Sequence, residues 1–184
     1  MRNISNINIG ESVRRRKLIL NEPKCDNSES IMVYITFGTF IFFAFIGLVH
    51  FNFTNTDESN LIVILPIGIL IFSVYIIYRK ATENHLLKIK TPYNDVSIKQ
   101  LLLEYSNNGS YEIYLNTNDC LILNETDIIT DITNSPYRTT IIILIEDNAV
   151  YFTVVKDQIK LNIPVLFTHY IILHDLKKLL NARS

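Results

Sequence analysis

Histidine, cysteine and acidic side chains can hold a metal or carry out acid–base chemistry, but their spacing in this chain favours neither. The chain has four histidines and two cysteines. His169 and His174 are five residues apart, so a helix would not place them on one face as it does ligands three or four apart. Neither Cys25 nor Cys120 has a C-x-x-C partner, and no G-x-S-x-G, Walker or G-x-G-x-x-G motif is present. We therefore expect no enzymatic activity, no metal and no resident cofactor.

Alternating polar and aromatic side chains in the last third of the chain are better suited to binding. Strand alternation puts Glu112, Tyr114 and Asn116 of "YEIYLNT" on one face and, in "AVYFTVVK", puts Tyr151 and Thr153 together. Aromatic rings next to Lys or Arg can stack on bases and neutralise phosphates. The candidate ligand-binding residues are Tyr114, Arg138, Tyr151, Thr153 and Lys160. The alternative is that they form the solvated outer face of a sheet.

A β-rich domain over residues 79–184 must position these side chains. Segments with a period of two, rich in Ile, Val, Thr and Tyr, run from "YEIYLNT" to "QIKLNIP" and predict five to seven antiparallel strands, with a tight turn at Asp147 and Asn148. We expect a barrel or a small sandwich, because a flat sheet of this size would leave edges uncovered. "NDVSIKQLLLEY" and "THYIILHDLKKLLN" predict helices, and Gly109 can take a left-handed turn after the first. "HLLKIK" is compatible with a strand or with a helical extension.

Two long apolar runs precede this domain. Residues 31–53 and 61–78 contain no Asp, Glu, Lys or Arg. As helices they would extend about 35 and 27 Å, against a hydrocarbon core of about 30 Å. The runs therefore predict two transmembrane helices joined by a short external loop over residues 54–60. The alternative is the buried helical hairpin of a soluble protein, but such helices usually expose a charged stripe, and neither run has one.

The distribution of charge predicts which way these helices cross. Four consecutive bases, Arg14 to Lys17, precede the first run, and Arg79 and Lys80 follow the second, whereas the connecting loop has two acids and no base. Loops rich in Lys and Arg stay in the cytoplasm, so both termini should be cytoplasmic in a multi-pass protein of the inner (plasma) membrane. Residues 1–30 read as a flexible cytoplasmic tail, and both cysteines as free thiols. A net charge of −1 favours no nucleic acid polymer as partner.

Two spans, an acidic outer loop and a cytosolic β-rich domain of about one hundred residues resemble the two-transmembrane β-barrel effectors of cyclic-oligonucleotide-based antiphage signalling systems (CBASS). The resemblance covers residues 31–184 as an order of elements. It implies that the barrel binds a cyclic di- or trinucleotide. It also implies that binding drives homo-oligomerisation and that the clustered spans disrupt the inner membrane. The helix at "NDVSIKQLLLEY" departs from this pattern.

Two other roles fit the same elements. "AVYFTVVKDQIKLNIPVLF" followed by a helix is similar to the tail of YcxB-like proteins, which also carry two spans, a helix, a β-rich domain of pleckstrin-homology-like (PH-like) appearance and an "IP" before the closing helix. That resemblance implies a membrane adaptor with no lethal output. An immunity protein against a membrane-directed toxin would suit a two-span anchor equally well.

Overall fold

The computed structural model describes residues 7–20, 27–54, 60–109, 111–125, 138–157 and 164–181; for residues 27–29, 50–54, 60–63, 138, 156 and 157 it describes the backbone alone. The chain divides into two compact units. The hairpin unit contains helices α2 and α3. The sheet unit comprises Met1–Lys24, Glu83–Ile159 and Val165–Ser184.

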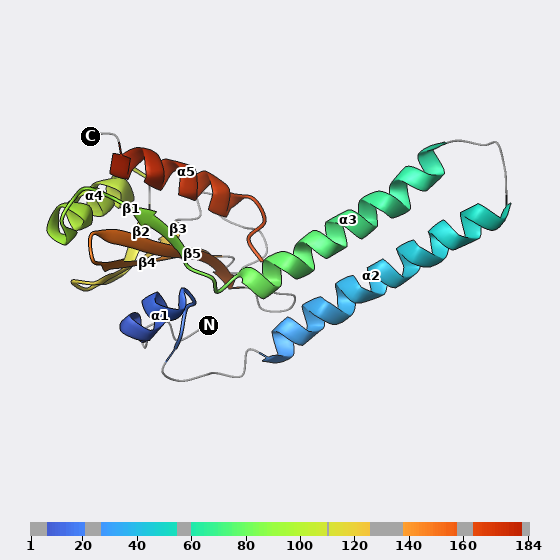
Figure 1. Cartoon of the computed structure of the whole chain (residues 1–184), viewed down its shortest axis with the longest axis horizontal. Helices are drawn as coiled ribbons and strands as arrows, with labels where there is room; N and C mark the ends of the chain where they lie inside the picture. Colours follow the sequence, from blue (N-terminus) through green and yellow to red (C-terminus); the bar gives the residue numbers. More distant parts are fainter. Residues whose placement is uncertain are drawn as a thin grey trace. The chain divides into compact units, whose positions relative to one another are not determined.

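The hairpin unit consists of two long helices that pack side by side, α2 (Asn27–Thr54) and α3 (Asn60–Thr82) (Figure 1). Both are long and apolar enough to cross a membrane, over Ser30–Val49 and Ile64–Thr82. They extend the expected runs at both ends, and α3 continues through Pro66. A Cβ added at Gly47 of α2 would lie 3.7 Å from Pro66 Cγ, so the two helices approach closely there.

Large apolar side chains point outward along both helices. Those more than half exposed are Ile31, Met32, Ile35, Phe42, Phe43, Phe45, Ile64, Leu65, Ile71 and Tyr78. A protein in water rarely leaves so much contiguous apolar surface uncovered. The hairpin is therefore suited to a hydrocarbon environment, as the sequence predicts.

The sheet unit is built on five antiparallel strands: β1 (Leu87–Lys90), β2 (Tyr111–Asn116), β3 (Cys120–Glu125), β4 (Arg138–Glu146) and β5 (Ala149–Asp157). Their order is β1-β5-β4-β3-β2. The expected antiparallel sheet is confirmed, and "HLLKIK" supplies a strand. Among the described strands, however, β1 and β2 lie at opposite edges of one sheet. These five strands therefore form a single open sheet, whereas the sequence predicts a barrel or a small sandwich. Helices cover its faces, and this layering removes the need for closure. The further strands expected at "DIITDIT" and "QIKLNIP" lie outside the described residues.

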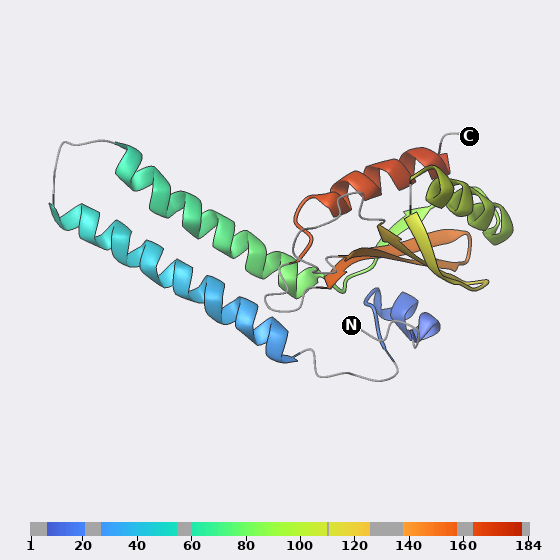
Figure 2. The ribbon, with the colours of Figure 1, turned by 180° about the vertical axis from the view of Figure 1, so that it is seen from behind.

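Helices α4 (Asp95–Asn108) and α5 (Thr168–Asn181) cover one face of this sheet (Figures 1 and 2). Asn94 caps α4 by accepting a hydrogen bond from Ser97 N at 2.8 Å, as the sequence predicts. The residues that join the helices to the sheet are Ile98, Leu101 and Leu102 of α4, Ile172, Leu176 and Leu180 of α5, and Leu121, Leu123, Ile141, Ile143, Phe152 and Val154 of the strands. The apolar positions that define each helical stripe are thus the positions that are buried.

The β4–β5 turn has the conformation that its residues predict. Asp147 and Asn148 have φ values of 53° and 54°, which is the left-handed pair that a two-residue type I′ hairpin requires. Asp95 at the start of α4 accepts a hydrogen bond from Asn148 N at 3.0 Å. The turn between β4 and β5 is therefore held in place by α4.

Part of the expected flexible tail is folded. Within residues 1–30, residues 7–20 form a short helix, α1 (Ile9–Arg15), and a return segment that pairs Leu20 with Ile7. This segment belongs to the sheet unit and packs on the face of the sheet away from α4 and α5. The prediction of a separate tail is wrong for these residues, because their apolar side chains cover a face of the sheet that would otherwise be open.

Candidate functional site

The second face of the sheet carries two of the five predicted binding residues. We define it as the alternate residues of β3, β4 and β5 that point away from α4 and α5, namely Cys120, Ile122, Asn124, Thr140, Ile142, Leu144, Ala149, Tyr151, Thr153 and Val155. All ten are buried. Tyr151 and Thr153 share this face as the sequence predicts, but they are only 6% and 5% exposed.

Residues 7–20, which we call the strap, cover this face. Ile7, Ile9, Val13 and Leu18 pack against its apolar side chains. The strap is held in its own shape by Ser12, which is fully buried and whose hydroxyl accepts a hydrogen bond from Ile19 N at 2.9 Å. Asn8 N donates to Ile19 O at 2.9 Å. The strap is therefore a small folded layer and not a loose segment.

The strap also pairs with the residues that directly follow α3. Leu86 N donates to Arg16 O at 2.9 Å, Leu18 N donates to Asn84 O at 2.7 Å, and Lys17 bridges His85. We call residues 16–18 and 84–86 the junction ladder. The chain reaches α2 seven residues after the strap ends at Leu20, and it leaves α3 at Thr82. The two segments that continue into the hairpin helices are thus hydrogen-bonded to each other.

Polar side chains on the second face are paired within the protein. Thr153 Oγ1 donates to Glu83 O at 2.7 Å, which attaches the residue after α3 to β5. Thr140 Oγ1 donates to Asn124 Oδ1 at 2.9 Å, and both side chains are buried. Their hydroxyl and amide groups lie among buried Ile, Leu and Val side chains, where each polar group needs a hydrogen-bond partner inside the protein. Sequence reasoning missed the Asn124–Thr140 pair, although an Asn in the strand "CLILN" is a recognisable signal.

A lysine ammonium group lies over the ring of Tyr151. Lys88 Nζ, from β1, lies 4.9 Å from the centre of the Tyr151 ring. This geometry is within range of a cation–π contact. The aromatic ring predicted to stack on a ligand base is therefore already in contact with the protein's own lysine.

The other three predicted residues are not gathered at this face. Tyr114 is half-exposed, and it lies at an irregularity where the register of β2 shifts between Ile113 and Leu115. The shift places Glu112 opposite Asn124 but Asn116 opposite Leu121, so the prediction that Glu112 and Asn116 share a face is wrong. A bulge adds one residue and reverses the alternation. Arg138 pairs with Asp157 at the end of β4 through the backbone, whereas its side chain and the whole of Lys160 lie outside the described part of the chain.

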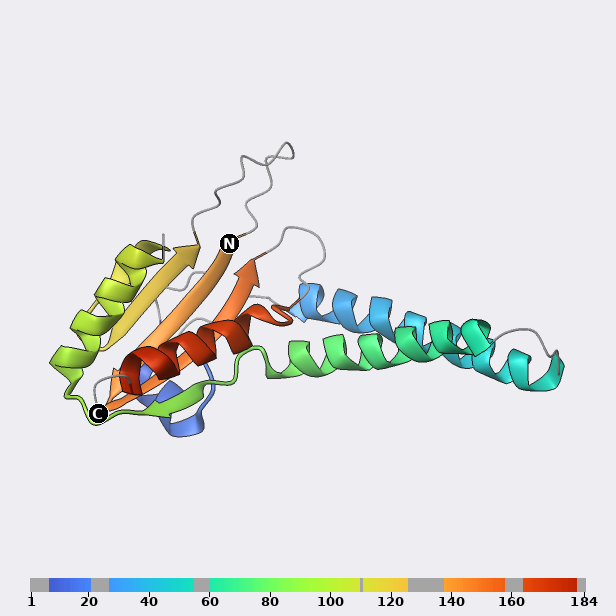
Figure 3. The ribbon, with the colours of Figure 1, turned by 90° about the horizontal axis from the view of Figure 1, so that it is seen from above.

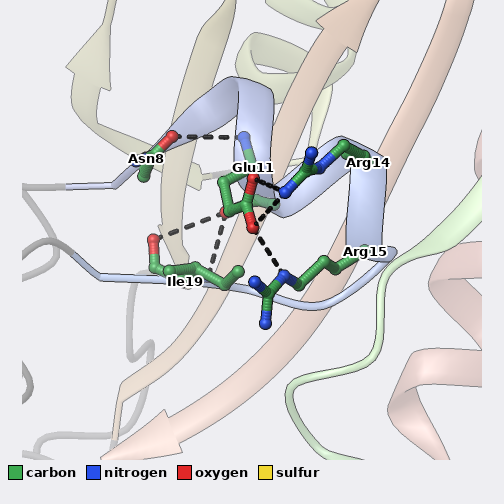
Figure 4. Close-up of polar contacts among 6 residues, drawn as sticks. Asn8, Glu11, Arg14, Arg15 and Ile19 are labelled. Carbon is green, nitrogen blue, oxygen red and sulfur yellow. Dashed lines mark hydrogen bonds and ion pairs between the residues drawn. The ribbon is translucent and has the colours of Figure 1, made fainter.

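The strap presents a run of exposed bases, Arg14 to Lys17. Figure 4 shows Arg14 and Arg15 converging on Glu11: Arg14 Nη2 lies 2.7 Å from Glu11 Oε2, and Arg15 Nε lies 2.5 Å from Oε1. The hydrogen bond from Arg14, assisted by Arg15, lowers the pKa of Glu11, so this carboxylate stays charged in mildly acidic solution. Arg16 and Lys17 have no such acidic partner among the described residues.

Side chains that could ligate a metal or act as nucleophiles are dispersed in the described part of the chain. No group of three or more His, Cys, Asp or Glu side chains comes together among the described residues. Burial, reinforced by Asp119, raises the pKa of the Cys120 thiol to about 11, which keeps it protonated and unreactive. His169 is buried on α5 whereas His174 is exposed, so the helix separates them.

Comparisons of this chain with protein-family models, with curated proteins and with solved structures found no match.

Proposed function

We propose that this chain is a two-span inner-membrane effector. Its cytoplasmic sheet unit binds a cyclic di- or trinucleotide, and binding causes the hairpins of several copies to assemble and disrupt the membrane, in defence against phage. The observation that carries the proposal is the junction ladder. It joins the strap, which covers the candidate binding face, to the residues next to α3. An event on the second face can therefore reach the segments leading to both hairpin helices.

The orientation in this proposal is supported by the position of the bases. Arg14, Arg15, Arg16 and Lys17 are exposed and lie shortly before α2 in the chain. Cationic segments next to a membrane span are retained in the cytoplasm and are attracted to its anionic leaflet. Both termini and the sheet unit are then cytoplasmic.

Ligand binding in this scheme requires the strap to move. Tyr151 and Thr153 are buried. The strap packs on the face that carries them, and the Thr153 hydroxyl is already bonded to Glu83 O, so a nucleotide can contact these side chains only after the strap has moved away. A ligand that binds only the open state shifts the population toward that state by its differential affinity. Opening the strap breaks contacts next to the junction ladder, which is how the hairpin would receive the signal.

A second role, that of a membrane adaptor without a lethal output, is favoured by one observation. The sheet is open among the described strands, α4 precedes most of its strands, and α5 closes one face. This is the order of elements that the YcxB-like, PH-like resemblance implies. In that role the second face has no ligand.

The test uses the full-length protein in lipid vesicles loaded with a fluorescent dye. Cyclic di- and trinucleotides are added at high micromolar concentration, and thermal unfolding and dye release are measured. A ligand at 100 times its Kd should stabilise the protein by about 2.7 kcal/mol, and dye release should follow. Arg138→Ala or Lys160→Ala should weaken the response. Lys99→Ala is the charge-matched control, because Lys99 Nζ bonds Thr117 O on another part of the unit.

The outcomes separate the two roles. Stabilisation with dye release supports the effector. Absence of stabilisation by every cyclic nucleotide refutes the ligand class and leaves the adaptor role favoured. Stabilisation without dye release would retain the binding function and refute the lethal output.

A further inference from the structure

Three large apolar residues form an exposed stripe at the start of α5. Phe167, Tyr170 and Ile171 are 63%, 52% and 61% exposed. They are spaced i, i+3 and i+4, so they lie on one side of the first turn. We call them the α5 stripe.

The stripe plays no part in the core of the sheet unit. The opposite side of α5 packs on the sheet through Ile172, Leu176 and Leu180, which are at most 3% exposed. The other exposed large apolar residues described in the sheet unit are spread over three separate elements: Leu87, Val96, Ile113 and Tyr114. Three such residues on a single turn are therefore a local concentration that folding of this unit does not explain.

The stripe lies at the end of the sheet where β1 begins. Thr91 Oγ1, just after β1, donates to Leu180 O at 3.2 Å, which places the C-terminal end of α5 at the end of β1. The helix runs about 21 Å from there back to Thr168. Figure 3 shows α5 starting over the end of the sheet at which β1 starts. β1 itself begins only five residues after α3 ends at Thr82, a distance of at most about 18 Å along the chain.

We propose that the α5 stripe docks into the interfacial region of the bilayer that α2 and α3 cross, as a second attachment of the sheet unit to the membrane. This inference rests on the membrane-spanning part of the proposed function, and it goes beyond that function by assigning a lipid-binding surface. Phe and Ile bury apolar area among the acyl chains, and Tyr keeps its hydroxyl in the headgroup layer. The short connection to α3 keeps the stripe within reach of the bilayer.

Charge on the same helix matches a lipid surface. Lys177 and Lys178 are exposed on the later turns of α5, with one exposed acid, Asp175. Juxtamembrane lysines are attracted to the anionic lipids of the cytoplasmic leaflet. An apolar turn followed by exposed lysines is suited to a membrane surface, whereas a second copy of this chain would bring the same positive charges together.

The chain contains no tryptophan, which allows a site-specific test. Phe167→Trp is prepared in the full-length protein in vesicles of phosphatidylcholine and phosphatidylglycerol. Some vesicles carry lipids brominated close to the headgroup, to report on the α5 stripe, and others carry lipids brominated near the ends of the acyl chains, because Phe43 lies near the middle of the α2 span. Val96→Trp is the matched control, because Val96 is also exposed (69%) near the start of a helix. Its neighbour Asp95 bonds the β4–β5 turn, which lies at the end of the sheet opposite to the α5 stripe. Phe43→Trp reports on α2.

We expect brominated lipid to quench most of the Phe167→Trp and Phe43→Trp fluorescence and to leave Val96→Trp unchanged. Acrylamide in the water should quench Val96→Trp alone. If Phe167→Trp behaves like Val96→Trp, the stripe faces water and the inference is wrong. If it is shielded from acrylamide but not quenched by brominated lipid, the stripe contacts another protein copy, which also overturns the inference.

The same data distinguish failure of this inference from failure of the proposed function. Quenching of Phe43→Trp without quenching of Phe167→Trp refutes only the docking of α5. Absence of quenching at Phe43→Trp means that α2 is not in the bilayer, which removes the premise of both. Circular dichroism melts of each variant verify folding, and Ile171→Trp replaces Phe167→Trp should the latter not fold.

Discussion

Replacing Thr153 by Val tests whether the Thr153 hydroxyl attaches Glu83, the residue that follows α3, to strand β5. Val has nearly the same shape but cannot donate a hydrogen bond. In the native protein Thr153 is 5% exposed and its hydroxyl donates to Glu83 O at 2.7 Å. Removing this donor from a buried carbonyl should cost about 1–3 kcal/mol. Residues 84–86 of the junction ladder follow Glu83 directly. The lost free energy should therefore make the hydrogen bonds of the ladder open more often.

Hydrogen exchange of the full-length protein in vesicles measures this cost. The amides of Leu86 and Leu18 donate to Arg16 O and Asn84 O, so they exchange only when the ladder opens. With a tenfold change in an equilibrium for every 1.4 kcal/mol, a loss of about 1–3 kcal/mol should speed their exchange by about 5-fold to more than 100-fold. Thr153→Ser keeps the hydroxyl and is the matched control.

Two results would refute this reasoning. If Thr153→Val leaves exchange at Leu86 and Leu18 unchanged, the hydroxyl does not hold Glu83. If Thr153→Ser accelerates exchange as much as Thr153→Val does, the methyl group and its packing matter instead of the hydrogen bond.

Three further substitutions test local features of the sheet unit. Asn94→Ala removes the cap of α4 and should lower the free energy of unfolding by about 0.5–2 kcal/mol, measured by thermal melting against Asn107→Ala on the exposed end of the same helix. Asn148→Ala should cost about 1 kcal/mol because Ala tolerates a φ of 54° poorly, whereas Asn148→Gly should cost nothing; equal melting temperatures for the two would disprove this. The raised pKa of Cys120 means that folding favours the neutral thiol, so its contribution to stability is complete below pH 9 and is lost as the pH rises to about 11. Cys120→Ala should therefore show a smaller decline in denaturation midpoint over that range than the native protein, and an identical decline would contradict the burial argument.

The candidate site could be predicted only in part. Strand alternation correctly placed Tyr151 and Thr153 on one face. It did not reveal that they are buried, because burial depends on which distant segment covers the strand. For Tyr114 the alternation itself is interrupted by the register shift in β2, which no local pattern of "YEIYLNT" indicates.

Gly109 shows a similar limit. The sequence predicts a left-handed turn there, but its φ is −89°, a conformation open to any residue. A Cβ at this position would lie 2.5 Å from Cε2 of Tyr111, whose ring stacks on Tyr105. The glycine ends α4 because space is needed for that ring, which is a requirement of side-chain packing and not of backbone conformation.

By itself the sequence determined the two apolar helices, the antiparallel strands, the β4–β5 turn and the stripes of α4 and α5. These follow from side chains within a few residues of one another, because helix and strand periods are local properties. Only the tertiary structure decided that the five described strands form an open sheet and that residues 7–20 cover its second face. Those outcomes depend on contacts between segments far apart in the chain, such as β1 with β5 and residues 7–20 with β3 to β5, which no short pattern encodes.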